Sequence, residues 1–406
     1  MGGKASLLLV LGFSVIFMVA GRNYSNMATS TVTNLSNYYI DAKTHTLAVS
    51  GSNMVINKVF LDPNMSDQSY NYSLDGGTIT ATYSTINANL KIKQLLVVGT
   101  MSGVSTSIKV VLKPSSFSKY AYFSNTEGNV WWTNKDTVWG PFHTNDNIRI
   151  NYNPVFYGKV TIGGNEIKSP ASSAASYYGG FQKGVNVTIP ANGVSSVATM
   201  AASGGASTSG QSLVYFEFRG DSIRYKYSSG GAWTYRLAST YAPNGVIYFD
   251  NAEVRLKGTV KGRYTIATSG TSNINRGSIY LDDNIVYNTN PKTNPSSTDM
   301  LGIVAQKNVW ITDNTANNTG GITIHASIYC QNGQFTAQNY SSRPVAGFID
   351  LLGGITQDER GPVGTVQNGV INHGFSKRYR YDDRLLIGGP PSFPGTGTFE
   401  VVSWFE

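Results

Sequence analysis

The sequence predicts a mainly β protein with a long N-terminal α-helix: the helix packs on a small antiparallel sheet, and a right-handed parallel β-helix (solenoid) follows. Three observations lead to this fold class. The chain of 406 residues begins with an uncharged apolar segment. Alternating apolar and polar residues follow it, as in half-buried strands. Beyond residue 246, short β runs recur in pairs, which is typical of a repeat architecture.

The apolar segment runs from Ala5 to Ala20, between Lys4 and Arg22. As a helix it covers ~24 Å, less than the ~30 Å of a membrane's hydrocarbon core. A side chain without polar groups suits both a lipid environment and dry packing against other helices. The residues that we expect to pack in a membrane or in a filament core are Leu7, Leu8, Leu9, Val10, Leu11, Phe13, Val15, Ile16, Phe17, Met18 and Val19.

The helix is expected to continue beyond this segment. No proline occurs before Pro63, and apolar residues recur at helical spacing at Ala28, Val32, Leu35, Tyr39 and Ala42. This pattern predicts one helix from about Lys4 to Phe60, on the order of 85 Å long. A cleaved secretory signal ending near Val19, Ala20 and Gly21 is the alternative.

Four alternating segments follow the helix and are predicted to form the small antiparallel sheet. They are Ser69–Leu74, Thr78–Ser84, Leu90–Val98 and Ser105–Leu112, with turns at residues 75–77 and 102–103. The predicted domains are therefore an apolar segment (1–21), an amphipathic continuation of the helix (22–60), an antiparallel β domain (61–115), a β-helix (116–375) with an insertion at 169–243, and a C-terminal tail packed on the solenoid (376–406).

The β-helix is predicted from pairs of apolar positions six residues apart: Val254/Val260, Ile279/Ile285, Ile303/Val309, Ile322/Ile328 and Ile349/Ile355. Successive pairs are expected to stack in phase as coils, with Asn284 and Asn308 forming an amide ladder. Trp131, Trp132, Trp139 and Phe142 are expected to cap the open end, and Ser195–Ser212 to form a flexible loop. A β-sandwich and a β-propeller are the alternative folds.

The N-terminal helix resembles that of type IV pilins and pilin-like assembly proteins. Residues 123–150 (FSNTEGNVWWTNKDTVWGPFHTNDNIRI) and 390–406 (PPSFPGTGTFEVVSWFE) resemble an uncharacterised family of pilin-like bacterial surface proteins. The resemblance implies a leader cut after Gly2 or Gly3, and a cell-surface filament in which the chain packs with copies of itself. It also implies the pilus assembly machinery as a partner and an inner-membrane location before assembly. Pilins usually carry a glutamate at the fifth mature position, whereas the first acidic residue here is Asp41.

Parallel β-helices often belong to enzymes that cleave acidic polysaccharides, and such a site requires carboxylates close enough to share a sugar. The sequence contains no established catalytic fingerprint, and we predict no catalytic residue, no cofactor and no metal site. We interpret Asp282 and Asp283 as turn residues. Cys330, the single cysteine, is expected to be a buried core residue. The candidates for an enzymatic site are Asp282, Asp283, Asp313, Asp350 and Asp358, with Lys307 and Arg360 as substrate clamps.

Aromatic residues are the better candidates for ligand contacts, because Tyr and Trp stack on sugars and supply rigid contact area. We name Tyr177, Tyr178, Trp233 and Tyr235 as possible contacts to glycans or other cells. The net charge of +8 is diffuse, and its densest run is Lys377, Arg378, Arg380 and Arg384. A diffuse charge without a docking motif predicts no nucleic-acid partner.

The function predicted from these features is a structural subunit of an extracellular pilus-like filament. The chain would assemble through its apolar helix and display the β-solenoid at the cell surface. A minor pilin or surface adhesin is the first alternative. A β-helix enzyme that degrades polysaccharides is the second.

Overall fold

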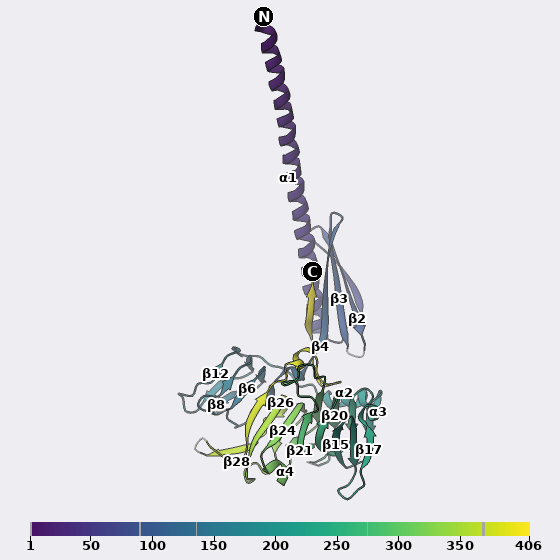
Figure 1. Ribbon diagram of the computed structural model, residues 1–406, viewed down its shortest axis with the longest axis vertical. Helices are drawn as coiled ribbons and strands as arrows, with labels where there is room; N and C mark the ends of the chain where they lie inside the picture. Colours follow the sequence, from purple (N-terminus) through teal and green to yellow (C-terminus); the bar gives the residue numbers. More distant parts are fainter. Residues whose placement is uncertain (1, 89–90, 135, 274, 368–369) are drawn as a thin grey trace. The chain divides into compact units, whose positions relative to one another are not determined.

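The computed structural model describes residues 2–88, 91–134, 136–273, 275–367 and 370–406. The chain forms two compact units (Figure 1). The first unit contains residues 1–114 and 397–406, and the second contains residues 115–396. The second unit is thus inserted into the sequence of the first, and the chain passes between the two units twice.

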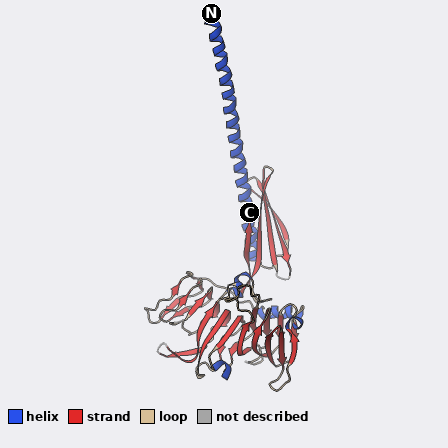
Figure 2. Ribbon diagram, in the orientation of Figure 1, coloured by secondary structure: helices blue, strands red, loops and turns tan. Residues whose placement is uncertain are grey.

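The first unit is built on one long helix, α1 (Gly2–Leu61). The expected helix from Lys4 to Phe60 is confirmed. Its C-terminal part lies along a small sheet, whereas its N-terminal part extends beyond the sheet without a neighbour among the described residues (Figures 1 and 2). The buried residues of the helix recur at helical spacing and form one stripe, which we call the sheet-facing stripe: Thr44, Leu47, Ala48, Gly51, Ser52, Val55 and Val59.

The sheet of the first unit has five strands in the order β1-β2-β3-β4-β29. The four predicted strands are confirmed, although Leu90, the expected start of the third, lies outside the described residues. The prediction of a tail at 376–406 packed on the solenoid is corrected for the end of the chain, because β29 completes this sheet, whereas residues up to 396 belong to the second unit. The strand bounds are β1 (Gln68–Leu74), β2 (Gly77–Asn87), β3 (Ile92–Met101), β4 (Val104–Ser116) and β29 (Gly395–Phe405).

Glycines bring the helix and the sheet into close contact. A Cβ atom on Gly99 of β3 would lie 2.4 Å from the Thr44 carbonyl oxygen and 2.8 Å from the Ala48 nitrogen. A Cβ atom on Gly51 of α1 would lie 2.4 Å from the Ile79 side chain. At Gly99 the backbones of helix and sheet approach each other too closely for any side chain, and at Gly51 the space for a side chain is taken by Ile79.

The second unit is dominated by a large, mostly parallel sheet of 22 strands, with β8 and β11 paired separately. Short helices connect the strands: η1 (Phe117–Lys119), α2 (Gly193–Ala202), α3 (Ala238–Tyr241), α4 (Thr315–Asn318) and α5 (Arg384–Ile387). The strands are β5 (Tyr122–Thr126), β6 (Thr137–Trp139), β7 (Phe142–Thr144), β8 (Ile148–Ile150), β9 (Val155–Phe156), β10 (Val160–Ile162), β11 (Glu166–Lys168), β12 (Ser176–Tyr177), β13 (Phe181–Lys183), β14 (Ala206–Thr208), β15 (Leu213–Gly220), β16 (Ser222–Lys226), β17 (Thr234–Leu237), β18 (Val246–Phe249), β19 (Glu253–Val260), β20 (Arg263–Thr268), β21 (Ile279–Tyr287), β22 (Met300–Ala305), β23 (Val309–Ile311), β24 (Ile322–Cys330), β25 (Phe335–Ala337), β26 (Val345–Glu359), β27 (Gly364–Gln367) and β28 (Val370–Arg380).

The parallel pairings form three ladders. The first ladder is β14-β18-β20-β22-β24-β26-β5-β7-β10-β13. The second is β15-β19-β21-β23-β25. The third is β15-β19-β21-β24-β26-β28-β6-β9-β12. Long strands such as β19 and β26 contribute to two ladders each.

The order of the ladders differs from the order of the sequence. The late strand β26 pairs with the early strand β5 through Ile355 and Tyr122, and β28 pairs with β6 through Tyr379 and Val138. Along the first and third ladders, the strands of residues 206–380 therefore come first in space, and the strands of residues 122–183 follow them although they come earlier in the sequence. Trp132, predicted to cap an open end, is 1% exposed in the middle of this arrangement.

The predicted phase of the β runs is correct only in part. Val254 pairs with Ile279, and Ile322 pairs with Ile349, as expected. Ile279 pairs next with Val309 rather than with Ile303, because Ile303 belongs to a different ladder. The loops between strands vary in length, so a fixed six-residue spacing does not keep one ladder in phase.

Two further expectations are corrected in this unit. Asn284 and Asn308 do not form a ladder with each other: each accepts a backbone N–H of a neighbouring strand or loop, from Thr323 and from Gln334. The stretch Ser195–Ser212, expected to be a flexible loop, contains most of α2 and all of β14. Helix α2 forms because Val194, Val197 and Ala201 recur at helical spacing and pack into one buried cluster.

The predicted insertion at 169–243 contributes to the sheet. Strands β14 and β15 pair in parallel with β18 and β19, and β16 and β17 extend β15 as antiparallel neighbours. The large apolar core of the unit lies among the ladders. Cys330 belongs to it and is fully buried, as predicted, and burial raises the pKa of its thiol to about 12.

Candidate functional site: the exposed helix and the polar junction

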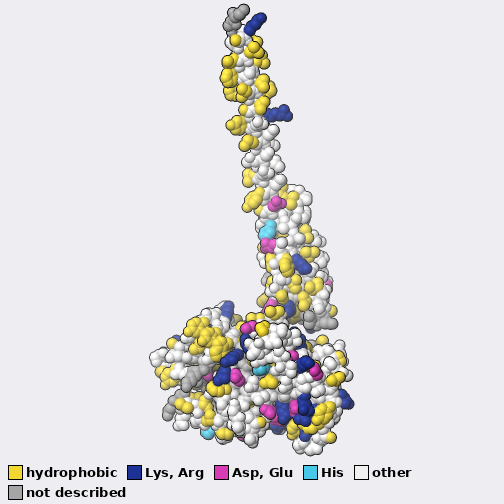
Figure 3. Space-filling view, in the orientation of Figure 1, with side chains coloured by type: hydrophobic (Ala, Val, Ile, Leu, Met, Phe, Trp, Pro, Cys, Tyr) yellow, Lys and Arg dark blue, Asp and Glu magenta, His cyan; other side chains and the backbone are white. Residues whose placement is uncertain are grey.

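The apolar segment of α1 is exposed on all sides. The eleven residues predicted to pack in a membrane or filament, Leu7 to Val19, have exposed fractions between 53% and 75%. Hydrophobic side chains cover this end of the helix in Figure 3. Within the described residues, α1 is the one helix that is long and apolar enough to cross a membrane, judged by length and composition.

The second part of the helix carries two different stripes. The predicted stripe at Ala28, Val32, Leu35, Tyr39 and Ala42 is exposed, with Val32 and Leu35 each 68% exposed. Successive helix residues are about 100° apart around the axis. At that angle, this stripe lies roughly 180° from the sheet-facing stripe. We call it the outer stripe, because the sheet does not cover it.

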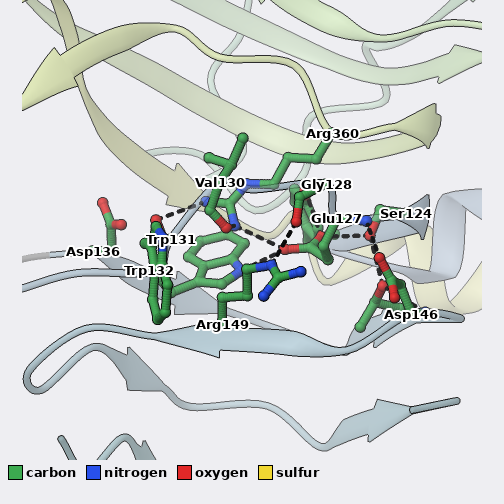
Figure 4. A network of polar contacts seen from close by, with 12 residues as sticks. Ser124, Glu127, Gly128, Val130, Trp131, Trp132, Asp136, Asp146, Arg149 and Arg360 are labelled. Carbon is green, nitrogen blue, oxygen red and sulfur yellow. Dashed lines mark hydrogen bonds and ion pairs between the residues drawn. The ribbon is translucent and has the colours of Figure 1, made fainter. Parts of the chain in front are cut away.

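A buried polar network joins the first and last parts of the second unit, where β5 pairs with β26 (Figure 4). The carboxylate of Glu127 accepts hydrogen bonds from Ser124 Oγ (2.5 Å), Tyr122 Oη (3.1 Å) and Trp132 Nε1 (2.9 Å). Arg360 completes the set with an ion pair of 2.8 Å between Nη1 and Oε2. We call these residues the junction network.

The guanidinium of Arg360 is almost completely buried and lies 3.9 Å from the centre of the Trp132 ring. Burial is the largest single influence and would lower the pKa of Arg360, but the charge and hydrogen bond of Glu127, together with Tyr122 and Asp136, raise the pKa on balance. Lys377 lies beside the same ring, 3.3 Å from a carboxylate oxygen of Asp136. Burial lowers the pKa of Lys377. The junction network is thus a satisfied structural network, and Arg360 is committed to Glu127 rather than free to clamp a substrate.

The other candidates for an enzymatic site are engaged in structural contacts. Asp282 and Asp283 lie inside the continuous strand β21, which corrects their interpretation as turn residues. No group of three or more His, Cys, Asp or Glu residues that could hold a metal occurs in the described parts of the chain. The contacts are Asp282 with Arg255 and Thr312, Asp283 with the Asn284 amide, Asp313 with Asn318 and Asn339, Asp350 with Arg378, Asp358 with Asn125, and Lys307 with the Thr271 carbonyl.

The four predicted ligand-contact aromatics lie in three environments. Tyr177 is stacked between Phe156 and Phe181, and its hydroxyl donates to Glu166 over 2.8 Å. Trp233 and Tyr235 lie together next to Arg224, which is 4.4 Å from the Trp233 ring centre. Tyr178 is 71% exposed and belongs to a separate surface.

Tyr178 ends a stack of exposed rings that the sequence analysis missed. The centres of Trp139 and Tyr157 are 5.6 Å apart, and those of Tyr157 and Tyr178 are 5.2 Å apart, with nearly parallel planes. Each ring precedes a glycine, and a Cβ atom on Gly158 would lie 2.0 Å from the Gly140 carbonyl oxygen. This recurring aromatic–glycine dipeptide is the sequence signal that could have revealed the stack.

Comparison with known proteins gives a family match over part of the chain and likenesses to solved structures. The model of a family described as a domain of unknown function (DUF4900) matches residues 79–164, well under half of the chain. No curated protein matches. The crystal structure of the competence-associated pilin ComZ from Thermus thermophilus is similar, with 11% identity and a TM-score of 0.38. That match covers 90% of this chain and 96% of the other. At a TM-score this low, it does not bear on what this chain does.

Proposed function

We propose that this chain is a structural subunit of a pilus-like filament at the cell surface, stored in the inner membrane before assembly. The observation that carries the proposal is the exposure of Leu7 to Val19 around the whole circumference of α1. Transfer of these side chains from water to an apolar environment is favourable by on the order of 10–20 kcal/mol in total. Such a segment requires lipid or other helices around it.

The outer stripe supports packing between subunits rather than a simple anchor. A single anchor needs an apolar segment only within the lipid, yet apolar residues continue at helical spacing to Tyr39, 54% exposed, and Ala42. They face away from the sheet of their own chain. In a bundle of parallel helices, these residues of one copy would pack on the helices of its neighbours.

For the second unit, we propose that the three ladders wind as the coils of a right-handed parallel β-helix displayed outward from the filament. Support comes from strands such as β19 and β26, which bend from one ladder into the next. Parallel strands joined by crossover connections follow a right-handed path in nearly all known cases. The role proposed for this unit is display or contact, not catalysis, because each candidate carboxylate is engaged with a structural partner.

An adhesin held at the cell surface in few copies is the second candidate function. The exposed stack of Trp139, Tyr157 and Tyr178 favours it, because exposed aromatic patches are frequent in recognition surfaces. This candidate predicts scarce copies on filaments made of another protein, whereas a structural subunit predicts filaments made mainly of this chain.

Replacing Leu9 with Asp tests the assembly proposal. A carboxylate in a dry helix bundle or in lipid is strongly disfavoured, so Leu9→Asp cells should lack filaments. The readout is electron microscopy of material sheared from producing cells, with mass spectrometry to identify the chain and its N-terminus. Leu237→Asp is the matched control, because Leu237 is 60% exposed and Leu9 is 61% exposed, but Leu237 lies in the second unit. Normal filaments from Leu9→Asp cells would refute the proposal.

A further inference from the structure

A cleft of about 400 Å³ lies on the surface of the second unit, where the segment of residues 186–191 passes over the first ladder. Its volume is within the range of small-ligand sites. One side is formed by Asn125, Asn145 and Asp358, which come from three neighbouring positions of the ladder. The opposite side is the segment itself, with the aliphatic residues Val187, Ile189 and Pro190.

The floor of the cleft is a chain of hydrogen bonds that runs in one direction. The Asn145 Oδ1 atom accepts from the Val187 amide (2.8 Å) and lies 2.8 Å from His143 Nε2, so His143 donates from Nε2. Asn145 Nδ2 donates to Asn125 Oδ1 (3.0 Å), and Asn125 Nδ2 donates to Asp358 Oδ1 (2.8 Å). The carboxylate of Asp358 is therefore the terminal acceptor of a fixed network.

The wall of the cleft is also fixed. The Asn145 side chain accepts a hydrogen bond from the Val187 amide over 2.8 Å and donates one to the Val187 carbonyl over 2.7 Å. Further along the segment, the Gln331 side chain donates a hydrogen bond to the Ala191 carbonyl and accepts one from the Val194 amide, each over 2.8 Å. Because both ends of the wall are held by side chains of the ladder, the cleft is preformed rather than dependent on a ligand for its shape.

Four polar groups in the cleft remain available. The side chains of Asn186, Thr188 and Asn332 are exposed and make no hydrogen bond to other described residues. The Oδ1 atom of Asp358 accepts a hydrogen bond from Asn125, and its Oδ2 atom makes no hydrogen bond to other described residues. Amide groups both donate and accept, and the carboxylate accepts. These free groups therefore match a ligand whose own groups both donate and accept hydrogen bonds.

We propose that this cleft binds a neutral oligosaccharide. Hydroxyl groups both donate and accept, as the two free amides and Asp358 require, and the C–H face of a sugar ring suits the aliphatic wall. No Lys, Arg or His side chain is among the described residues that line the cleft, so an acidic sugar would meet only the Asp358 charge. One carboxylate is too few for a calcium site, which takes six to eight oxygen ligands.

Titration of the full-length chain with maltotriose, cellotriose and triacetylchitotriose tests this inference. The protein is kept in a zwitterionic detergent, because maltoside and glucoside detergents would compete. Binding is measured by saturation-transfer difference NMR and calorimetry, with polygalacturonate as the acidic comparison. We expect at least one of the three neutral probes to bind and polygalacturonate not to bind. Failure of all three neutral probes, or binding of polygalacturonate alone, would overturn the inference.

Substitutions locate the site. The double variant Asn186→Ala/Asn332→Ala removes the two free amides and should weaken binding about tenfold or more. Asp358→Asn keeps an acceptor for Asn125 but removes the charge, and it should weaken binding about fivefold. Asn129→Ala, at an exposed asparagine outside the cleft, should bind as the parent does. Unchanged affinity in the cleft variants, with near-parental circular dichroism, would place the sugar elsewhere and overturn the inference. The result does not depend on whether the chain forms filaments.

Discussion

At the scale of single residues, the junction network carries the clearest energetic consequence. Glu127 and Arg360 are 233 residues apart in sequence, and both are withdrawn from water. A buried ion pair contributes little net stability compared with apolar residues of the same shape, but the loss of one partner leaves an unpaired charge. Each charge can stay buried only beside the other. The ion pair therefore favours the pairing of β26 with β5 over other strand pairings.

Replacing Arg360 with Met should lower the free energy of unfolding by about 3–5 kcal/mol, because the Glu127 carboxylate then remains buried without its cation. Urea unfolding followed by tryptophan fluorescence measures the change. Lys261→Met is the control: it breaks an exposed pair with Asp221, which water screens, so the free energy of unfolding should change far less than in Arg360→Met. The double variant Glu127→Gln/Arg360→Met should recover part of the loss. Equal effects of Arg360→Met and Lys261→Met would contradict this account.

The buried His143 predicts a dependence of stability on pH. Burial lowers the pKa of its imidazole below the ordinary 6.5, and although the Asn145 hydrogen bond acts against this, Lys119 adds to it. Below about pH 6.5 the unfolded chain binds a proton that the folded chain does not. The contribution of His143 to the free energy of unfolding is therefore fully present above about pH 6.5, and it is lost as the pH falls through the lowered pKa.

His143→Gln should flatten the dependence of the unfolding free energy on pH between about 7 and 5, since one source of differential proton binding is removed. Unfolding by urea at several pH values gives the slope. Burial also lowers the pKa of His325, so His143→Gln/His325→Gln should flatten the slope further. An unchanged slope in both variants would show that these histidines take up protons equally in the folded and unfolded chains.

At the scale of elements, periodicity predicted α1 and the first four strands because each is a local pattern of the sequence. The stripe predicted for the helix was real, but it is the outer stripe; the sheet packs on the opposite face, which contains Thr44, Gly51 and Ser52 and is poor in large apolar residues. A hydrophobic pattern identifies a face that packs against something. It does not identify the partner.

The site could be predicted less well than the elements. Tyr178 was predicted as a surface aromatic, but its partners Trp139 and Tyr157 lie 39 and 21 residues earlier in the sequence and were missed. Arg360 was considered as a substrate clamp, because nothing near it in sequence reveals Glu127. Interactions across the ladders depend on which strands pair, and local periodicity does not reveal that pairing.

The close contact of helix and sheet predicts a strong effect at Gly99. In Gly99→Ala the new methyl group would collide with the backbone of α1 at Thr44 and Ala48, which cannot move without the whole helix. We expect the first unit to lose about 2–4 kcal/mol of stability, as for overpacked cores. Thermal unfolding monitored by circular dichroism measures this. Gly230→Ala is the control, because a Cβ atom there meets nothing within 4 Å. A melting temperature equal to that of the control would contradict the contact.

At the scale of the whole molecule, the chain order separates the residues proposed for assembly from those proposed for display. The apolar segment, the outer stripe and the five-stranded sheet belong to residues 1–114 and 397–406, whereas the ladders, the aromatic stack and the cleft belong to residues 115–396. The chain leaves the first sheet at the end of β4 and returns at the start of β29, which are neighbouring strands. An insertion between neighbouring strands can vary without disturbing the sheet that holds it.

Excision of residues 115–396 should therefore leave a folded first unit. Thr396 Oγ1 lies 3.4 Å from the Ser115 carbonyl oxygen, and the Phe117 amide donates to the Pro394 carbonyl over 3.1 Å, so a short Gly-Ser linker can join Pro114 to Gly397. We expect the shortened chain to keep the β4–β29 pairing, to assemble filaments in cells and to lose sugar binding. Amide exchange of β29 and electron microscopy report the first two properties. A folded first unit that forms no filaments would mean that the ladders take part in assembly, and the proposed division between an assembling unit and a displayed unit would then be wrong.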